Sequence, residues 1–138
     1  MQTIQIIIDL VLAALFGGVI GLERQQAKQF AGLRTHMLIC LGAALITMLS
    51  VQGFSEPTSP ARIIANIIVA AGFIGAGTVI AARGEIHGLT TASSVWVVAA
   101  IGMAISLHFY AAAVTALLIT LAVLELWRLE IKFGLKKK

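Results

Sequence analysis

An all-α membrane protein with a bundle of about five transmembrane helices is the fold class that this sequence predicts. Of its 138 residues, 59% are hydrophobic and only 12% are charged, and the mean hydropathy is +1.00. A soluble domain of this length cannot bury so much apolar surface, so lipid is the expected solvent for most of the chain. The short length also predicts a single domain over residues 1–138.

The first three helices are expected in order along the N-terminal part of the chain. Residues 3–22 form an apolar run of spanning length in which Asp9 is the only charge. A second apolar run, residues 36–54, ends at the proline-marked polar segment 55–60, which reads as a loop. The third helix is expected at residues 61–82.

The last two helices come from one long stretch that has no charged residue between Leu89 and Leu124. This stretch exceeds the ~20 residues of an ordinary span. Its only central polar interruption is Ser-Leu-His at 106–108. We therefore divide it into helices at 89–106 and 109–127.

Basic residues predict the orientation in the membrane. In the five-helix layout, nine of the 10 Lys and Arg residues fall on one side, in the loops 23–36 and 83–88 and in the C-terminal tail. Only Arg62 falls on the other side. The positive-inside rule then places the N-terminus outside and the C-terminus in the cytoplasm. A four-helix layout would leave the basic tail outside. No nucleic-acid-binding motif is present.

Glycines cluster in the segment AAGFIGAGTVI of the third helix. Neither the P-loop pattern nor G-x-G-x-x-G occurs, so nucleotide binding is not expected. Small residues let membrane helices approach closely. We expect the first and third helices to pack tightly, against each other or across a homo-oligomer. The glycines assigned to packing are Gly17, Gly21, Gly72, Gly75 and Gly77.

Asp9 is a candidate functional residue inside the membrane. It lies about six residues into its helix, or ~9 Å, where a carboxylate is costly and functional by default. The alternatives are a structural ion pair with Arg62 and a carboxylate that reaches water near the helix end. One carboxylate alone is a poor magnesium site.

Glu23, Arg24 and Arg34 gather at the expected cytoplasmic face. They form either a charge cluster that fixes helix depth or a docking or ligand surface, and Glu23 and Arg34 are placed to pair.

Four hydroxyl residues, at positions 90, 91, 93 and 94, crowd the start of the fourth helix. Their hydroxyls either cap the helix and form hydrogen bonds between helices, or they form a polar site for an anion or water. The candidate site residues in this group are Thr90, Thr91 and Ser94.

Enzymatic activity, a cofactor and a metal site are not expected. The chain has neither H-E-x-x-H nor G-x-S-x-G. Its histidines, His36, His87 and His108, are divided between the two sides of the membrane in this layout.

Five segments together resemble the MgtC/SapB family of bacterial inner-membrane proteins: GLERQ (21–25), AGLRT (31–35), ARIIANII (61–68), GFIGAGTVI (72–80) and GLTTASSVW (88–96). The resemblance covers about residues 5–125 in the family's order. It implies a multi-pass protein linked to magnesium homeostasis and growth in low magnesium and, in pathogens, to survival inside macrophages. It implies membrane partners such as the F-type ATP synthase, whose restraint is ascribed to one family member. Thr35, Arg62 and Asn66 are candidate sites because they stand in these segments.

The sequence departs from the family pattern in two places. Many relatives carry a cytoplasmic C-terminal regulatory domain, whereas this chain stops at Lys138, so no such domain is expected. Some virulence-linked relatives have asparagine where this chain has Thr90, which puts the virulence-specific activity in question. Two functions stay open: a non-enzymatic regulator acting through helix contacts, or a small ion or solute transporter with Asp9, Asn66 and the Thr/Ser cluster along its path.

Overall fold

The computed structural model describes residues 3–52, 60–82 and 85–132. The described residues form five helices and two short strands: α1 (Thr3–Gln26), α2 (Leu33–Gln52), α3 (Pro60–Ala76), β1 (Ile80–Ala82), β2 (Glu85–His87), α4 (Leu89–Ser106) and α5 (Tyr110–Lys132). The two strands pair antiparallel, with Ile80 opposite His87. Most of the predicted loop at 55–60, Arg83 and the tail after Lys132 lie outside the described residues.

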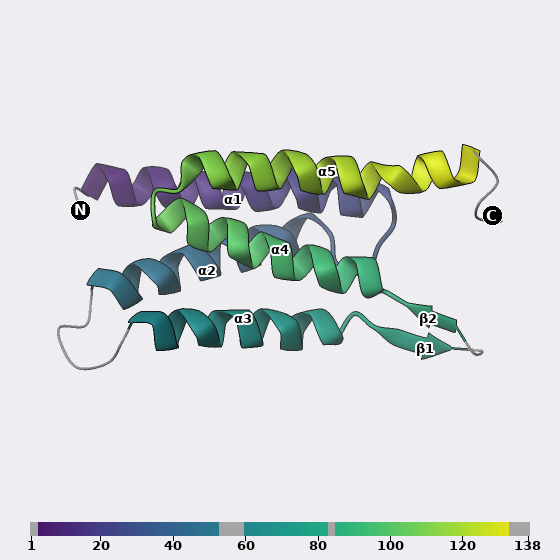
Figure 1. The fold of residues 1–138 in the computed structure, drawn as a ribbon, viewed down its shortest axis with the longest axis horizontal. Helices are drawn as coiled ribbons and strands as arrows, with labels where there is room; N and C mark the ends of the chain where they lie inside the picture. Colours follow the sequence, from purple (N-terminus) through teal and green to yellow (C-terminus); the bar gives the residue numbers. More distant parts are fainter. Residues whose placement is uncertain (1–2, 53–59, 83–84, 133–138) are drawn as a thin grey trace.

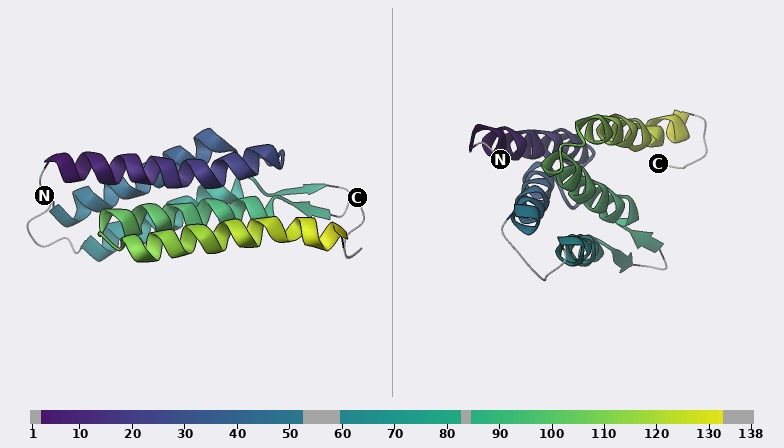
Figure 2. Two further views of the ribbon diagram at one scale, coloured as in Figure 1. Left: turned by 90° about the horizontal axis from the view of Figure 1, so that it is seen from above. Right: turned by 60° about the vertical axis from the view of Figure 1, so that its left-hand side comes forward.

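Successive helices alternate in direction, so the two termini lie at opposite ends of the bundle (Figure 1). The end of α1, the starts of α2 and α4 and the β1–β2 hairpin, which projects beyond the helices, lie at one end of the bundle, called here the hairpin end (Figure 1). At the turn end, α1 begins and a tight turn joins α4 to α5. Helices α2 and α4 are central: α1 packs on both, α3 packs on both, and α5 packs on α4 and α1 (Figure 2).

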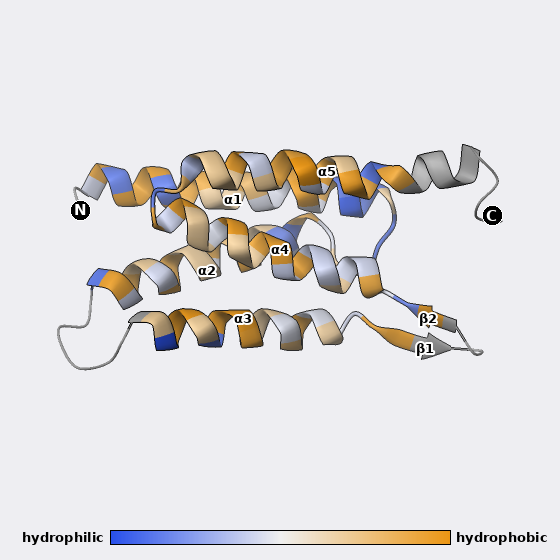
Figure 3. Ribbon diagram, viewed as in Figure 1, coloured by the Kyte–Doolittle hydropathy of each residue, from blue (hydrophilic) through white to orange (hydrophobic). Residues whose placement is uncertain are grey.

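The helices have the composition of membrane spans. Helices α1, α2 and α4 are long and apolar enough to cross a membrane, and the apolar parts of α3 and α5, residues 61–76 and 110–126, are shorter. Hydrophobic residues run along all five helices, and hydrophilic residues gather mainly near helix ends (Figure 3). The prediction of a helical membrane protein is confirmed, as is the division of the long uncharged stretch into α4 and α5. The orientation of the termini stays a prediction.

The third helix is shorter than predicted, because α3 ends at Ala76 and not at residue 82. The hydroxyl of Thr78 donates to the carbonyl oxygen of Gly75 at 2.7 Å, so a local side-chain bond competes with continuation of the helix. Residues 78–80 are all β-branched, which favours extended backbone. The chain therefore leaves α3 as a strand and returns to α4 through the hairpin.

A three-helix junction centres on Cys40 of α2, which is fully buried. A methyl group added to Gly17 of α1 would lie 2.7 Å from the Cβ of Cys40. One added to Gly102 of α4 would overlap the carbonyl oxygen of Cys40. Glycine at these two positions therefore lets α1 and α4 both approach the backbone of α2.

The prediction that the first and third helices pack against each other within one chain is wrong. Helices α2 and α4 lie between them (Figures 1 and 2). The physical reason is the chain's connectivity, because the hairpin holds α3 beside α4 while α1 pairs with α2. At Gly21, as at Gly17, an added methyl would meet α2, 2.8 Å from the Cα of Leu33.

The three glycines of α3 and its end have different surroundings. At Gly75, an added methyl would lie 3.1 Å from the carbonyl oxygen of Ala92 on α4. At Gly77 it would meet only the carbonyl oxygen of Ile74, in its own turn. At Gly72 it would meet no atom of the described residues within 4 Å. Of these three glycines, only Gly75 allows a close contact with another helix among the described residues.

Candidate functional site

A buried histidine joins α2 to α4 at the hairpin end. His36 has no exposed surface. Its Nδ1 lies 2.9 Å from the carbonyl oxygen of Gly32, and its Nε2 lies 3.0 Å from Oγ of Ser94. A carbonyl oxygen can only accept, so Nδ1 carries the hydrogen. Nε2 and Oγ of Ser94 are within hydrogen-bond distance, and the hydroxyl of Ser94 itself donates to the carbonyl oxygen of Thr91.

Thr91 extends this network to the loop between α1 and α2. Its side chain is fully buried, and its hydroxyl donates to Oε1 of Gln29 at 3.4 Å. Its carbonyl oxygen lies 2.8 Å from the hydroxyl of Ser94, one turn later. The predicted Thr/Ser cluster is therefore divided by helical geometry: Thr91 and Ser94 face the bundle, whereas Thr90 and Ser93 are exposed.

Glu23 and Arg24, at the end of α1, form a largely buried ion pair. Their side chains are only 10% and 4% exposed. Nη2 of Arg24 donates to one carboxylate oxygen at 2.8 Å, and its Nε donates to the other. A buried guanidinium needs such a counter-charge. Glu23 is therefore paired with its neighbour Arg24. The pairing of Glu23 with Arg34 that the sequence indicated is not found.

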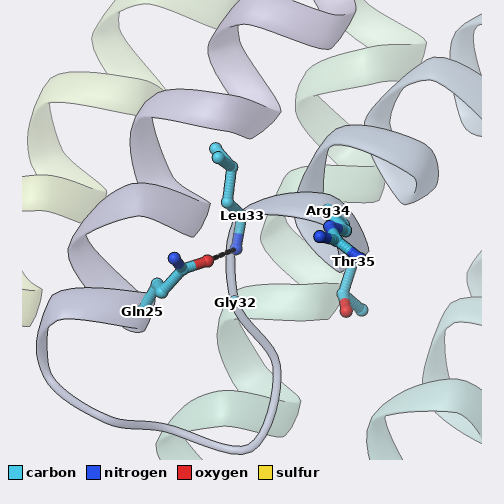
Figure 4. Close-up of a pocket in the computed structure, with 5 residues that line it drawn as sticks. All are labelled: Gln25, Gly32, Leu33, Arg34 and Thr35. Atoms are coloured by element: carbon cyan, nitrogen blue, oxygen red, sulfur yellow. Dashed lines mark hydrogen bonds between the residues drawn. The ribbon is translucent and has the colours of Figure 1, made fainter.

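Arg34 and Thr35 line an open pocket of 380 Å³ at the start of α2 (Figure 4). Gln25 reaches across from α1, and its Oε1 accepts a hydrogen bond from the backbone N–H of Leu33 at 3.3 Å. Arg34 is exposed. The guanidinium of Arg34 is therefore an accessible charge at the hairpin end, whereas that of Arg24 is buried and paired with Glu23.

Two predicted site residues, Arg62 and Asn66, lie away from this network on an exposed face of α3. The opposite face of α3 buries Ile67 and Ala71 against the core. Neither Arg62 nor Asn66 forms a side-chain hydrogen bond with another residue in the part of the chain that the structure describes.

A second polar cluster surrounds Asp9 near the turn end. Asp9 is fully buried, and its Oδ1 accepts hydrogen bonds from Gln5 at 2.9 Å and from the hydroxyl of Tyr110 at 2.7 Å. Its Oδ2 lies 3.2 Å from Nε2 of His108, without the geometry of a hydrogen bond. The predicted pairing with Arg62 is wrong, because α1, α5 and the α4–α5 turn supply the partners.

Sequence reasoning missed the partners of both buried polar groups. Gln5 stands one helical turn before Asp9, a spacing that would have identified it. Tyr110, 101 residues after Asp9, gives no such signal. His36 follows the AGLRT segment directly, but its contact with Ser94 spans 58 residues.

Both clusters connect helices. No group of three or more His, Cys, Asp or Glu side chains within residues 3–52, 60–82 and 85–132 is placed to hold a metal ion. The hairpin-end network instead links α1, α2 and α4 through engaged polar groups.

The MgtC family model matches residues 10–130 of the chain. Four of the five segments that carry the resemblance meet at the hairpin end. GLERQ lies near the end of α1, AGLRT leads into α2, GFIGAGTVI runs from α3 into β1, and GLTTASSVW begins α4.

Individual relatives agree with this match. The chain is 43% identical over 144 aligned residues to "Putative magnesium transporter YhiD" of Escherichia coli K12, covering 99% of this chain and 66% of the relative. It is 39% identical over 115 residues to Protein MgtC of Salmonella typhimurium LT2 (83% of this chain, 49% of the relative), and 39% over 118 residues to Protein MgtC of Brucella abortus (84% and 48%). The chain thus spans about half to two thirds of the length of these curated relatives. No solved structure matches it. On the family match and these identities, the chain belongs to the MgtC family.

Proposed function

We propose that this protein is a non-enzymatic regulator in the bacterial inner membrane, linked to magnesium homeostasis and to growth in low magnesium. It acts through helix contacts with membrane partners, with its N-terminus outside and its C-terminus in the cytoplasm. Membership of the MgtC family and the name of the YhiD relative support the link to magnesium. The F-type ATP synthase is the partner put forward by the family resemblance, and a second copy of the chain is another.

One observation carries the proposal of helix contacts: the outer face of α3, formed by Arg62, Asn66, Val69, Gly72 and Phe73. Val69 is 71% exposed and Phe73 is 82% exposed. Asn66 follows the start of α3 by six residues, ~9 Å along the axis, inside the apolar segment 61–76, which we propose lies in the hydrocarbon region. There an amide gains from pairing with another helix, and a glycine permits that helix to come close.

A photo-activated crosslinker at Phe73 tests this proposal in cells grown in low magnesium. We expect defined adducts with an ATP synthase subunit or with a second copy of the chain. The matched control is Leu118 on α5, which is 60% exposed and should give mainly lipid adducts. Equal protein adducts at both positions, or none at Phe73, would contradict docking on this face.

Transport is the second candidate, favoured by the buried carboxylate of Asp9 and by the name of the YhiD relative. Liposomes that contain only this protein and a magnesium-sensitive dye test it. Magnesium entry that is lost in Asp9→Asn would support transport. No entry above that of empty liposomes would leave the regulator as the function.

A further inference from the structure

We propose that Asp9 and His108 form a proton-binding pair that holds the α4–α5 turn on α1 while the imidazole of His108 is protonated. This site lies at the turn end, apart from the outer face of α3 and from the hairpin-end network. This role of the buried carboxylate does not depend on whether the protein acts as a regulator or as a transporter.

The hydrogen bonds of Asp9 leave one oxygen for this role. Gln5 and Tyr110 both donate to Oδ1, which fixes the orientation of the carboxylate. Oδ2 is fully buried, has no hydrogen-bond partner among the described residues, and lies 3.2 Å from Nε2 of His108. A buried carboxylate without a compensating charge is strongly unfavourable. A protonated imidazole at this distance supplies the positive charge that compensates the carboxylate.

The backbone of the turn holds His108 where it meets both Asp9 and water. Its φ of 62° is left-handed, a conformation that non-glycine residues seldom adopt and that persists where the surrounding structure imposes it. Backbone hydrogen bonds from His108 to Ile105 and from Phe109 to Ala104 close the turn. The side chain of His108 is 44% exposed while that of Asp9 is sealed. Protons therefore reach the pair through His108.

The other elements packed around Asp9 bring no competing charge in the described part of the chain. Helix α1 contributes Gln5, and α5 contributes the hydroxyl of Tyr110. The part of α2 that runs to the turn end, residues 37–52, has no charged residue. His108 is therefore the described residue that compensates the carboxylate.

The test measures the thermal midpoint of the full chain in lipid nanodiscs between pH 5 and 8.5. The ion pair exists only while the imidazole of His108 is protonated, so its contribution to stability is present at acid pH and absent at alkaline pH. The wild-type midpoint should fall by a few degrees across this range. His108→Gln should remove this component, and His108→Lys, a permanent cation, should keep the midpoint near its acid value throughout.

His87→Gln is the matched control, because His87 is an exposed histidine of β2 at the opposite end of the bundle. It should keep the wild-type pH profile. The proposal is overturned if His108→Gln keeps that profile, or if the midpoint of His108→Lys still falls as the wild type does. Both variants change a half-exposed turn residue, so the comparison does not depend on replacing the buried Asp9.

Discussion

Replacing Gly102 with alanine should weaken the bundle at its three-helix junction. The new methyl carbon would overlap the carbonyl oxygen of Cys40 and would lie 3.2 Å from the backbone nitrogen of Ala44. Ordinary contact begins at 3.4 Å, so α2 and α4 must shift apart to accept the methyl group. The obstacle is backbone, which cannot rotate aside as a side chain can.

The free-energy cost follows from this displacement. Overpacking of a close-packed core costs about 1–3 kcal/mol, and the helix preference for alanine over glycine returns at most about 1 kcal/mol. We therefore expect Gly102→Ala to lose on the order of 2 kcal/mol of folding free energy. The matched control is Gly72→Ala, since no described atom lies within 4 Å of the new methyl.

The assay is unfolding of the purified protein in mixed detergent micelles, followed by circular dichroism as the denaturing detergent is increased. Wild type and Gly72→Ala should unfold together, with Gly102→Ala clearly earlier. If Gly102→Ala unfolds with Gly72→Ala, then α2 and α4 do not approach as closely as described, and the packing argument fails.

Four further predictions follow from the same structure. Arg24→Met should cost about 3–5 kcal/mol because it leaves the carboxylate of Glu23 buried and unpaired; the double variant with Glu23→Leu should unfold later than Arg24→Met alone, and equal or earlier unfolding would refute the pairing. His36→Phe should cost about 1–3 kcal/mol through the polar groups it leaves unpaired, which detergent unfolding would show and wild-type stability would contradict. Gly75→Leu should lower the thermal midpoint more than Gly75→Ala, because a single methyl carbon at 3.1 Å needs only a small adjustment of α4; the reverse order would refute this. Of two reporters fused after Lys138, the one that works only in the cytoplasm should be active and the one that works only in the periplasm should be inactive. Activity of the periplasmic reporter would contradict the predicted orientation.

Much of the fold was predictable because the length and hydrophobicity of a local segment are enough to identify a membrane helix. Apolar length and the polar break at 106–108 were enough to divide α4 from α5, because a span must match the bilayer. The early end of α3 was not predictable in this way. Residues 78–80 are apolar enough to continue a helix, and the competing bond from Thr78 to Gly75 is visible only in the structure.

The candidate site was predictable in its members but not in its pairings. Asp9 and Arg24 stand out because charge is rare in so apolar a chain. Their partners depend on which helices are neighbours, and the helix order in space is set by the hairpin and the turn. Asp9 therefore meets Tyr110 and His108 in place of the expected Arg62.

The central claim is that the outer face of α3 docks a membrane partner. The most direct test is whether the Gly72→Leu variant supports growth in low magnesium. The leucine side chain would project from a position with no described atom within 4 Å, so folding and abundance should stay at the wild-type level. In a bacterial strain that depends on this protein for growth in low magnesium, we predict that Gly72→Leu fails to support growth. Wild-type growth at normal abundance would contradict the claim that the function passes through this face.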